Sequence, residues 1–240
     1  MQCAQSTRVC FAYFQFGIDG MKRKQVYSIL IVFLALLWVL AVGIQQNTKY
    51  NSTTKAMVYI TNEGYGGNGS IYDVKSDSLV IVTTYHLLQD SEEVMVYFPT
   101  QDIVPGKVLG VDEKHDVGFI EVSTDGIGYD TLEDLCCVHY DEKAVDELEI
   151  DDTMEYRFLE WNGGNVSSVK HKGKIGHTNW YIDDFDDYFI YNYCEVAPGM
   201  SGCAAVAEDG SYIGMMIGGV DNESGALSAK TIAGLYENMR

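Results

Sequence analysis

APGMSGCAAV, residues 197–206, places Ser201 between two glycines inside an otherwise apolar run. Gly199 stands two positions before the serine, and Gly202 directly follows it. Glycine supplies the positive φ that tight turns need, so the pattern fits an ordinary β-turn. It also fits a bent loop that presents a nucleophile. The choice depends on whether the chain supplies a base for Ser201 and a group that orients this base.

The composition is that of an acidic chain with enough apolar residues for a large core. Of its 240 residues, 47% are hydrophobic, which is sufficient for one or two domains without help from disulfides or metals. The formal net charge of −19 disfavours nucleic acids and anionic lipids as partners, because like charges repel. The sequence contains no cysteine or histidine spacing typical of zinc, and we expect neither a metal nor a cofactor.

Short segments rich in Val, Ile and Tyr recur in two series along the chain, and each is bounded by Gly, Asp, Asn or Pro. This spacing is typical of an all-β sandwich or barrel. The acidic stretch 140–152 predicts a connection between the series, and residues 228–239 predict a short helix. The simplest architecture is therefore all-β, with two six-stranded barrels at about 57–135 and 150–230 and a short C-terminal helix.

An uncharged apolar run, residues 26–44, has about the length of roughly 20 residues that a helix needs to cross a membrane. The basic cluster that precedes it predicts a cytoplasmic N-terminus and a single-pass signal-anchor. The alternative is a signal peptide that is cleaved to release a secreted protein. The predicted parts are a cytoplasmic tail at 1–25 with a possible start at Met21, a transmembrane helix at 26–44, a linker at 45–56, and an extracytoplasmic domain at 57–240.

His86 and Asp116 supply the two groups that a nucleophilic serine needs. His86 follows β-type residues in IVTTYHLL, and Asp116 opens another such run in KHDVGFI. Both stand at predicted strand ends, where a rigid sheet can aim a side chain at a cleft. The order His, Asp, Ser puts the first two in the first barrel and Ser201 in the second, as a two-barrel protease requires. His115 adjoins Asp116, but strand alternation points it to the opposite face.

With these residues in order, the chain resembles a chymotrypsin-fold, trypsin-like serine protease of the HtrA (Deg) type over residues 57–239. The family's glycine-rich entry strand and its T-x-x-H, D-[LIV]-A and P-G-N-S-G-G motifs correspond to GGNGSIYD, TTYHLL, HDVGFIEV and PGMSGC. Each motif is weak alone, whereas their joint order and spacing are specific. The sequence shows no trailing PDZ module, so we expect none. The resemblance leaves a monomer and a trimer open.

The resemblance implies a role for each matching residue. Ser201 is the nucleophile, His86 acts as general base and then general acid, and Asp116 orients His86. The backbone N–H groups of Gly199 and Ser201 form the oxyanion hole. The implied reaction is hydrolysis of peptide bonds in peptides or unfolded proteins through an acyl-enzyme. The apolar run 26–44 adds the expectation that the enzyme is attached to the cell membrane through its N-terminal helix.

Two residues depart from the family pattern. Met200 replaces the Asp or Asn that usually precedes the nucleophile, and Cys203 replaces a glycine and adds bulk beside the oxyanion loop. These departures keep open a second function, a weak or inactive protease-like domain that binds extended peptides by β-augmentation. Cys194 and Cys203 lie on either side of the nucleophile, and a disulfide between them is a further hypothesis.

The resemblance also places the pocket for the P1 side chain of the substrate. It implies walls from Val196 before the nucleophile and from Gly218, Gly219 and Val220 after it, which favours an apolar P1 residue. Glu195 stands where trypsin-like digestive enzymes carry the acid that selects a basic P1 residue. A basic preference therefore stays open.

Overall fold

The computed structural model describes residues 23–240. The chain divides into two compact units, Met1–Asn47 and Thr48–Arg240, and each is described by itself. Helix α2 (Arg23–Lys55) crosses this boundary. The stretch predicted as a linker, residues 45–56, continues α2 as far as Lys55, because each further helical residue adds a backbone hydrogen bond at little cost.

The apolar run 26–44 lies within α2. In the part of the chain that the structure describes, no helix is both long and apolar enough to cross a membrane. The transmembrane helix predicted from the sequence is therefore not supported. Most of the predicted cytoplasmic tail, residues 1–25, lies outside the described residues.

The first barrel is closed by six antiparallel strands in the order β1-β2-β3-β6-β5-β4. Strand β3 is buried along its whole length, whereas β5 alternates between buried and more exposed positions in its first half, as a barrel wall with one wet face requires. The strands are β1 (Met57–Asn62), β2 (Tyr65–Val74), β3 (Ser78–Thr84), β4 (Glu93–Tyr97), β5 (Ile103–Asp112) and β6 (Val117–Ser123).

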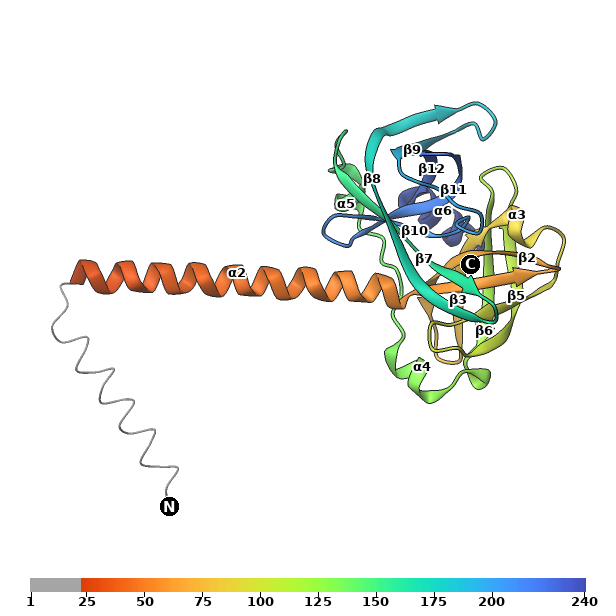
Figure 1. The fold of residues 1–240 in the computed structure, drawn as a ribbon, viewed down its shortest axis with the longest axis horizontal. Coiled ribbons are helices and arrows are strands. Elements are labelled where there is room, and N and C mark those ends of the chain that lie inside the picture. Colours follow the sequence, from red (N-terminus) through yellow and green to blue (C-terminus); the bar gives the residue numbers. More distant parts are fainter. Residues whose placement is uncertain (1–22) are drawn as a thin grey trace, which may run out of the picture. The chain divides into compact units, whose positions relative to one another are not determined.

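The second barrel is also closed, in the order β10-β11-β12-β9-β8-β7. Its strands β7 and β8 form a long hairpin that is clearly visible in Figure 1. The strands are β7 (Thr153–Asn162), β8 (Asn165–Ile182), β9 (Asp187–Tyr193), β10 (Ala204–Ala207), β11 (Tyr212–Val220) and β12 (Glu223–Ser228). The predicted all-β fold of two six-stranded barrels is confirmed.

Two-residue turns set the register of several hairpins. Between β1 and β2 the turn residues Glu63 and Gly64 have φ of 47° and 92°, and Asn62 pairs with Tyr65. Positive φ at both central residues matches the twist of the flanking strands. Asp221, with φ of 55°, opens the corresponding turn between β11 and β12.

The C-terminal helix α6 (Ala229–Met239) joins the two barrels. The Ser228 side chain caps it by accepting a hydrogen bond from the Lys230 N–H, at 3.2 Å. Tyr236 is buried, and its ring lies 5.1 Å from that of Tyr72 and 5.3 Å from that of Phe119, both in the first barrel. The predicted short helix is confirmed, and it holds the two barrels in contact.

The connection between the barrels contains short helices that the sequence reading did not predict. They bury few side chains, so their sequences lack the apolar periodicity that would predict a helix. They are η1 (Thr124–Gly126), α4 (Tyr129–Asp134) and α5 (Glu142–Asp146).

Candidate active site

His86 and Asp116 form a hydrogen-bonded pair at one end of the first barrel. His86 Nδ1 donates to Asp116 Oδ2 over 2.7 Å, and the His86 backbone N–H donates to Asp116 Oδ1, also over 2.7 Å. The Asp116 backbone carbonyl accepts a further hydrogen bond from the Tyr85 N–H, at 3.0 Å. Both carboxylate oxygens are thus used to hold His86. This arrangement fixes the imidazole tautomer and leaves Nε2 as the nitrogen that can act as a base.

The backbone of Asp116 adopts the left-handed region, with φ of 55°. Aspartate is one of the few non-glycine residues that visit this region at modest cost. Here the conformation lets the side chain reach back to His86 while the next residue, Val117, begins β6. Strained backbone conformations of this kind are frequent at functional sites, where contacts with the surrounding structure hold the residue in place.

Helix α3 (Tyr85–Leu88) carries His86 and is held in place by buried side chains and by hydrogen bonds to Asn62. Leu87 and Leu88 are buried, and Asn62 Nδ2 donates to both of their carbonyls at 2.9 Å. These bonds satisfy carbonyls at the end of the helix that would otherwise lack partners. The His86 side chain is 50% exposed and that of Asp116 12%, so the ring faces solvent while its partner is shielded.

Ser201 lies in the turn between β9 and β10, where glycine is required on both sides. Gly199 has φ of 90° and Gly202 has φ of 83°, which are conformations that other residues rarely adopt. The turn is closed by hydrogen bonds from the Met200 N–H to the Ala197 carbonyl, at 3.2 Å, and from the Cys203 N–H to the Met200 carbonyl, at 2.9 Å. The two glycines therefore shape a bent loop that presents Ser201.

The N–H groups of Gly199 and Ser201 differ from those of their neighbours. Among the described residues, neither group donates to an acceptor, whereas the N–H groups of Met200, Gly202 and Cys203 all do. Backbone donors are rarely left without a partner in a folded chain. Two such donors on one bent loop can together donate hydrogen bonds to a negatively charged oxygen.

Ser201 and His86 come from neighbouring segments. A Cβ at Gly67 would lie 2.8 Å from Leu87 Cδ2 and 3.2 Å from the Ser201 carbonyl oxygen. Leu87 and the loop that carries Ser201 thus both contact Gly67, where there is no room for a side chain. Within residues 23–240 no hydrogen bond joins Ser201 to His86, so this contact stays a prediction. Hydrogen bonds of this kind are often long before substrate binds.

Met200 and Cys203 point into the core of the second barrel. Both side chains are fully buried in its hydrophobic cluster. The Met200 sulfur accepts a hydrogen bond from the Ala197 N–H at 3.1 Å, and Cys203 Sγ lies 3.8 Å from the Met216 sulfur. The sequence reading that Cys203 adds bulk beside the oxyanion loop is therefore wrong, because its side chain faces inward.

The predicted disulfide between Cys194 and Cys203 is absent, and both residues are free thiols. Burial raises the pKa of the Cys194 thiol to about 11 and that of Cys203 well above its usual value. Both thiols therefore stay protonated near neutral pH, and neither forms a reactive thiolate there.

A cavity of about 350 Å³ opens directly beside Ser201. Three of the predicted pocket residues, Val196, Gly218 and Gly219, contribute to its wall. The full lining consists of Val196, Ala197, Pro198, Gly199, Ser201, Met216, Gly218, Gly219 and Asp221.

Two predicted pocket residues, Glu195 and Val220, lie outside this lining. Glu195 is exposed, and its carbonyl accepts a hydrogen bond from His171 Nδ1 at 2.9 Å. Val220 is 73% exposed at the end of β11. The sequence reading missed Met216 and Asp221. The pair Asp221-Asn222 is a turn signal that would have placed a bend here, with Asp221 at the rim of the pocket.

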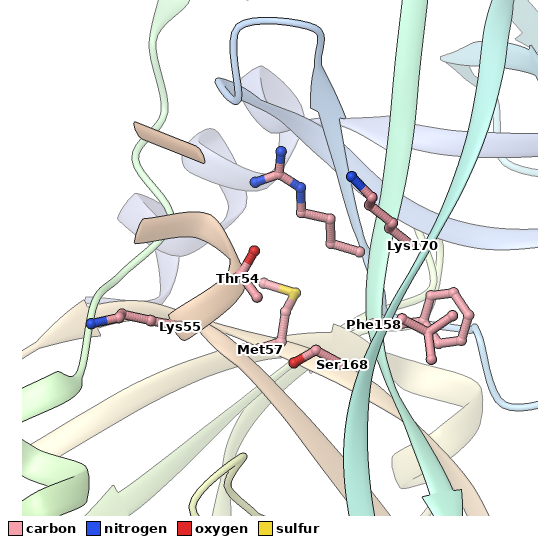
Figure 2. A pocket seen from close by; sticks show the side chains of 8 residues that line it. Thr54, Lys55, Met57, Phe158, Ser168 and Lys170 are labelled. Atoms are coloured by element: carbon pink, nitrogen blue, oxygen red, sulfur yellow. The ribbon is translucent and has the colours of Figure 1, made fainter. Parts of the chain in front are cut away.

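A second cavity, of about 330 Å³, lies elsewhere on the domain and contains none of the predicted site residues. Figure 2 shows its side chains, which come from the end of α2, the start of β1 and the β7–β8 hairpin. Lys55 and Lys170 contribute positive charge to it, and Met57 and Phe158 apolar surface.

Comparison with known proteins agrees with the motifs. Residues 67–215 match the trypsin-like peptidase domain family. A protein named "Serine protease HtrA-like" from Staphylococcus aureus (strain bovine RF122) is 26% identical over 196 residues, which cover 69% of this chain and 23% of the relative. A protein of the same name from Staphylococcus epidermidis is 28% identical over 178 residues, which cover 71% and 29%. The chain thus spans about a quarter of the length of these relatives. The resemblance predicted from the motifs is confirmed.

Proposed function

We propose a mechanism for this chain, which belongs to the trypsin-like peptidase family and is similar to its HtrA-like members: hydrolysis of peptide bonds by Ser201, His86 and Asp116. The observation that carries the proposal is the combination of two features. Asp116 fixes the tautomer of His86 through a 2.7 Å hydrogen bond, and the N–H groups of Gly199 and Ser201 are unused in the described part of the chain. The first feature prepares a base, and the second prepares a site for an oxyanion.

The reaction proceeds in two steps, acylation of Ser201 and hydrolysis of the acyl-enzyme. Ser201 Oγ attacks the substrate carbonyl while its proton passes to His86 Nε2, and the negative charge on the carbonyl oxygen is held by the N–H groups of Gly199 and Ser201. Asp116 stabilises the imidazolium. Collapse of the intermediate breaks the C–N bond, and His86 gives its proton to the leaving amine. Water then attacks the acyl carbon and gives its proton to His86 Nε2; the bond from the acyl carbon to Ser201 Oγ breaks, His86 returns the proton to Oγ, and the carboxylic acid is released.

The walls of the cavity beside Ser201 support an apolar P1 preference, although the lining also includes one acidic residue, Asp221. Val196 and Met216 supply apolar surface to it, and Gly218 and Gly219 leave its wall without side chains. Glu195, the residue that could have selected a basic P1 side chain, lies outside the lining. We propose peptides or unfolded proteins as the substrates, because an extended chain is needed to reach a site between two barrels.

The alternative function, a peptide-binding domain without activity, rested on Met200 and Cys203. Both side chains are fully buried, and neither residue lines the cavity beside Ser201. This removes the observation that favoured the alternative.

We propose an extracytoplasmic site of action on the sequence pattern alone. The support is the basic cluster Lys22 to Lys24 before an uncharged apolar run. Protease added to intact cells or spheroplasts should then digest the segment after residue 45 and spare the N-terminal flank. Protection of the whole chain until lysis would refute this location.

Labelling by a fluorophosphonate probe tests the mechanism. The wild-type chain should be labelled, and Ser201→Ala should not, whereas Ser168→Ala is a matched control because Ser168 lines the other cavity. Asp116→Asn should fold and still label very slowly, because an amide holds the wrong tautomer of His86. Equal labelling of the wild type and Ser201→Ala would refute the assignment of the nucleophile.

A further inference from the structure

Asn68 in β2 is fully buried, and its side chain joins the first barrel to the nucleophile loop. Asn68 Nδ2 donates to the Gly199 carbonyl at 2.7 Å and to the Leu159 carbonyl at 3.1 Å. Asn68 Oδ1 accepts from the Leu159 N–H at 2.7 Å. Because Leu159 belongs to β7, one carboxamide holds together both barrels and the loop that carries Ser201. Both of its N–H groups and its oxygen are used.

The backbone of Asn68 reaches the same two parts of the active site. Its N–H donates to the Ser201 carbonyl at 2.8 Å. Its carbonyl accepts from Thr83 Oγ1 at 2.6 Å, and Thr83 stands near the end of β3, three residues before His86. Asn68 is therefore bonded both to the strand that leads to the base and to the loop that bears the nucleophile.

These contacts restrict the peptide groups around the unused donors. A peptide unit is planar, so a hydrogen bond that fixes a C=O also fixes the N–H on its other end. Asn68 holds the carbonyls of Gly199 and Ser201, which belong to the peptide units on either side of the Met200–Ser201 peptide. The Ser201 N–H belongs to this middle peptide, and its neighbours cannot rotate without breaking a bond to Asn68.

We propose that Asn68 is a positioning residue that sets the direction of the Ser201 N–H group toward the oxyanion, an inference that rests on the proposed function. Asn68 touches no substrate. It acts through two carbonyls: its side chain holds that of Gly199, and its backbone N–H holds that of Ser201. A neutral carboxamide suits this task, because it can donate to two carbonyls and accept from an N–H at a buried position without carrying a charge.

Kinetics of Asn68→Leu provide the test, since leucine has a similar volume and removes every side-chain hydrogen bond at this position. The kcat for a peptide substrate should fall by about 10²-fold, as for the loss of an oxyanion donor, while KM stays unchanged. The pH profile of kcat/KM should keep its shape, because His86 and Asp116 remain paired. Affinity for a peptide aldehyde, which forms an oxyanion with Ser201, should fall by the same factor as kcat.

Asn192→Leu is the matched control. Asn192 is also fully buried and uses its Nδ2 for two hydrogen bonds, to the Tyr156 hydroxyl at 2.9 Å and to the Ile190 carbonyl at 3.0 Å. These bonds lie inside the second barrel and do not involve the nucleophile loop. The control should lose stability and keep the wild-type kcat. Equal losses of kcat in both variants would reduce Asn68 to a structural residue and overturn the proposal.

Thr83→Val keeps the proposal testable if Asn68→Leu does not fold. It removes only the hydrogen bond to the Asn68 carbonyl, and it should lower kcat by a smaller factor without changing KM. An unaltered kcat in this variant would count against the proposal. A wild-type chain that neither hydrolyses peptides nor reacts with a fluorophosphonate would refute the proposed function instead. In that case, a crystal structure of Asn68→Leu decides the present inference, and an unmoved Gly199 carbonyl would overturn it.

Discussion

Gly202→Ala should both destabilise the domain and slow turnover, because two separate costs meet at this position. The first cost is conformational. Gly202 has φ of 83°, and a side chain in the left-handed region costs about 1–2 kcal/mol. The second cost is steric, because a Cβ would lie 2.0 Å from the Asn68 carbonyl oxygen and 2.8 Å from Thr83 Oγ1.

The steric cost sets the size of the expected effect on catalysis. A carbon and a carbonyl oxygen normally approach no closer than about 3.3 Å, so the nucleophile loop would have to move by roughly 1 Å. Overpacking of this kind costs about 1–3 kcal/mol in addition to the conformational cost. A displacement of about 1 Å at reacting groups lowers the rate by about 10²-fold. We therefore expect a loss of about 2–5 kcal/mol in stability and of about 10²-fold in kcat for Gly202→Ala.

Gly64→Ala separates the two costs. Gly64 has φ of 92°, close to that of Gly202, but nothing lies within 4 Å of the position of its Cβ. This variant should lose about 1–2 kcal/mol and keep the wild-type kcat. Urea unfolding measures the stability of both variants, and steady-state hydrolysis of a peptide substrate measures kcat. If the two variants lost the same stability, or if Gly202→Ala kept the wild-type kcat, the steric argument would be refuted.

Three further predictions concern the triad, the tyrosines and the cysteines. His86→Ala and Ser201→Ala should each remove nearly all turnover, and the double variant should lose little more, because the triad acts as a unit; additive losses in a peptidase assay would contradict this. Burial raises the pKa of Tyr72 to about 12, so the folded state keeps a proton that the unfolded chain releases near pH 10. The stability that this provides is present below about pH 10 and is lost as the pH rises toward about 12, and urea unfolding at stepped pH should show a shallower loss for Tyr72→Phe. Cys194 and Cys203 should react with a thiol reagent only after unfolding, and rapid labelling of the native protein would show that the second barrel opens.

The fold could be predicted because most strands of both barrels are rich in apolar and β-branched residues, which favour strands. Strand β3 is a run of β-branched and apolar residues, and β6 and β7 are similarly rich in such residues. Strand β12 carries little local signal, because its sequence, ESGALS, holds a glycine and two serines and lacks β-branched residues. It forms through pairing with β9 and β11, which is a tertiary effect that local sequence does not carry.

The pair His86–Asp116 could be predicted from motifs, whereas the role of Asn68 could not. Asn68 lies within the motif GGNGSIYD, but a motif does not show which distant groups a residue contacts. Asn68 is distant in the chain from Gly199 and Leu159, and its contacts with them exist only after both barrels have closed. A buried asparagine within a strand is unusual by composition, but the sequence does not show which carbonyls it meets.

The two departures from the family motif illustrate how a loop divides its residues between chemistry and packing. The positive φ at Gly199 and Gly202 bends the chain twice within the loop that carries Ser201. As a result, Ser201 lines the cavity, while Met200 and Cys203 are fully buried in the cluster of the second barrel. The inward positions are constrained by volume and apolarity, which a thioether and a thiol satisfy. The outward position alone is constrained by reactivity, so a departure at Met200 or Cys203 changes how the barrel is filled and leaves the groups that would carry the reaction in place.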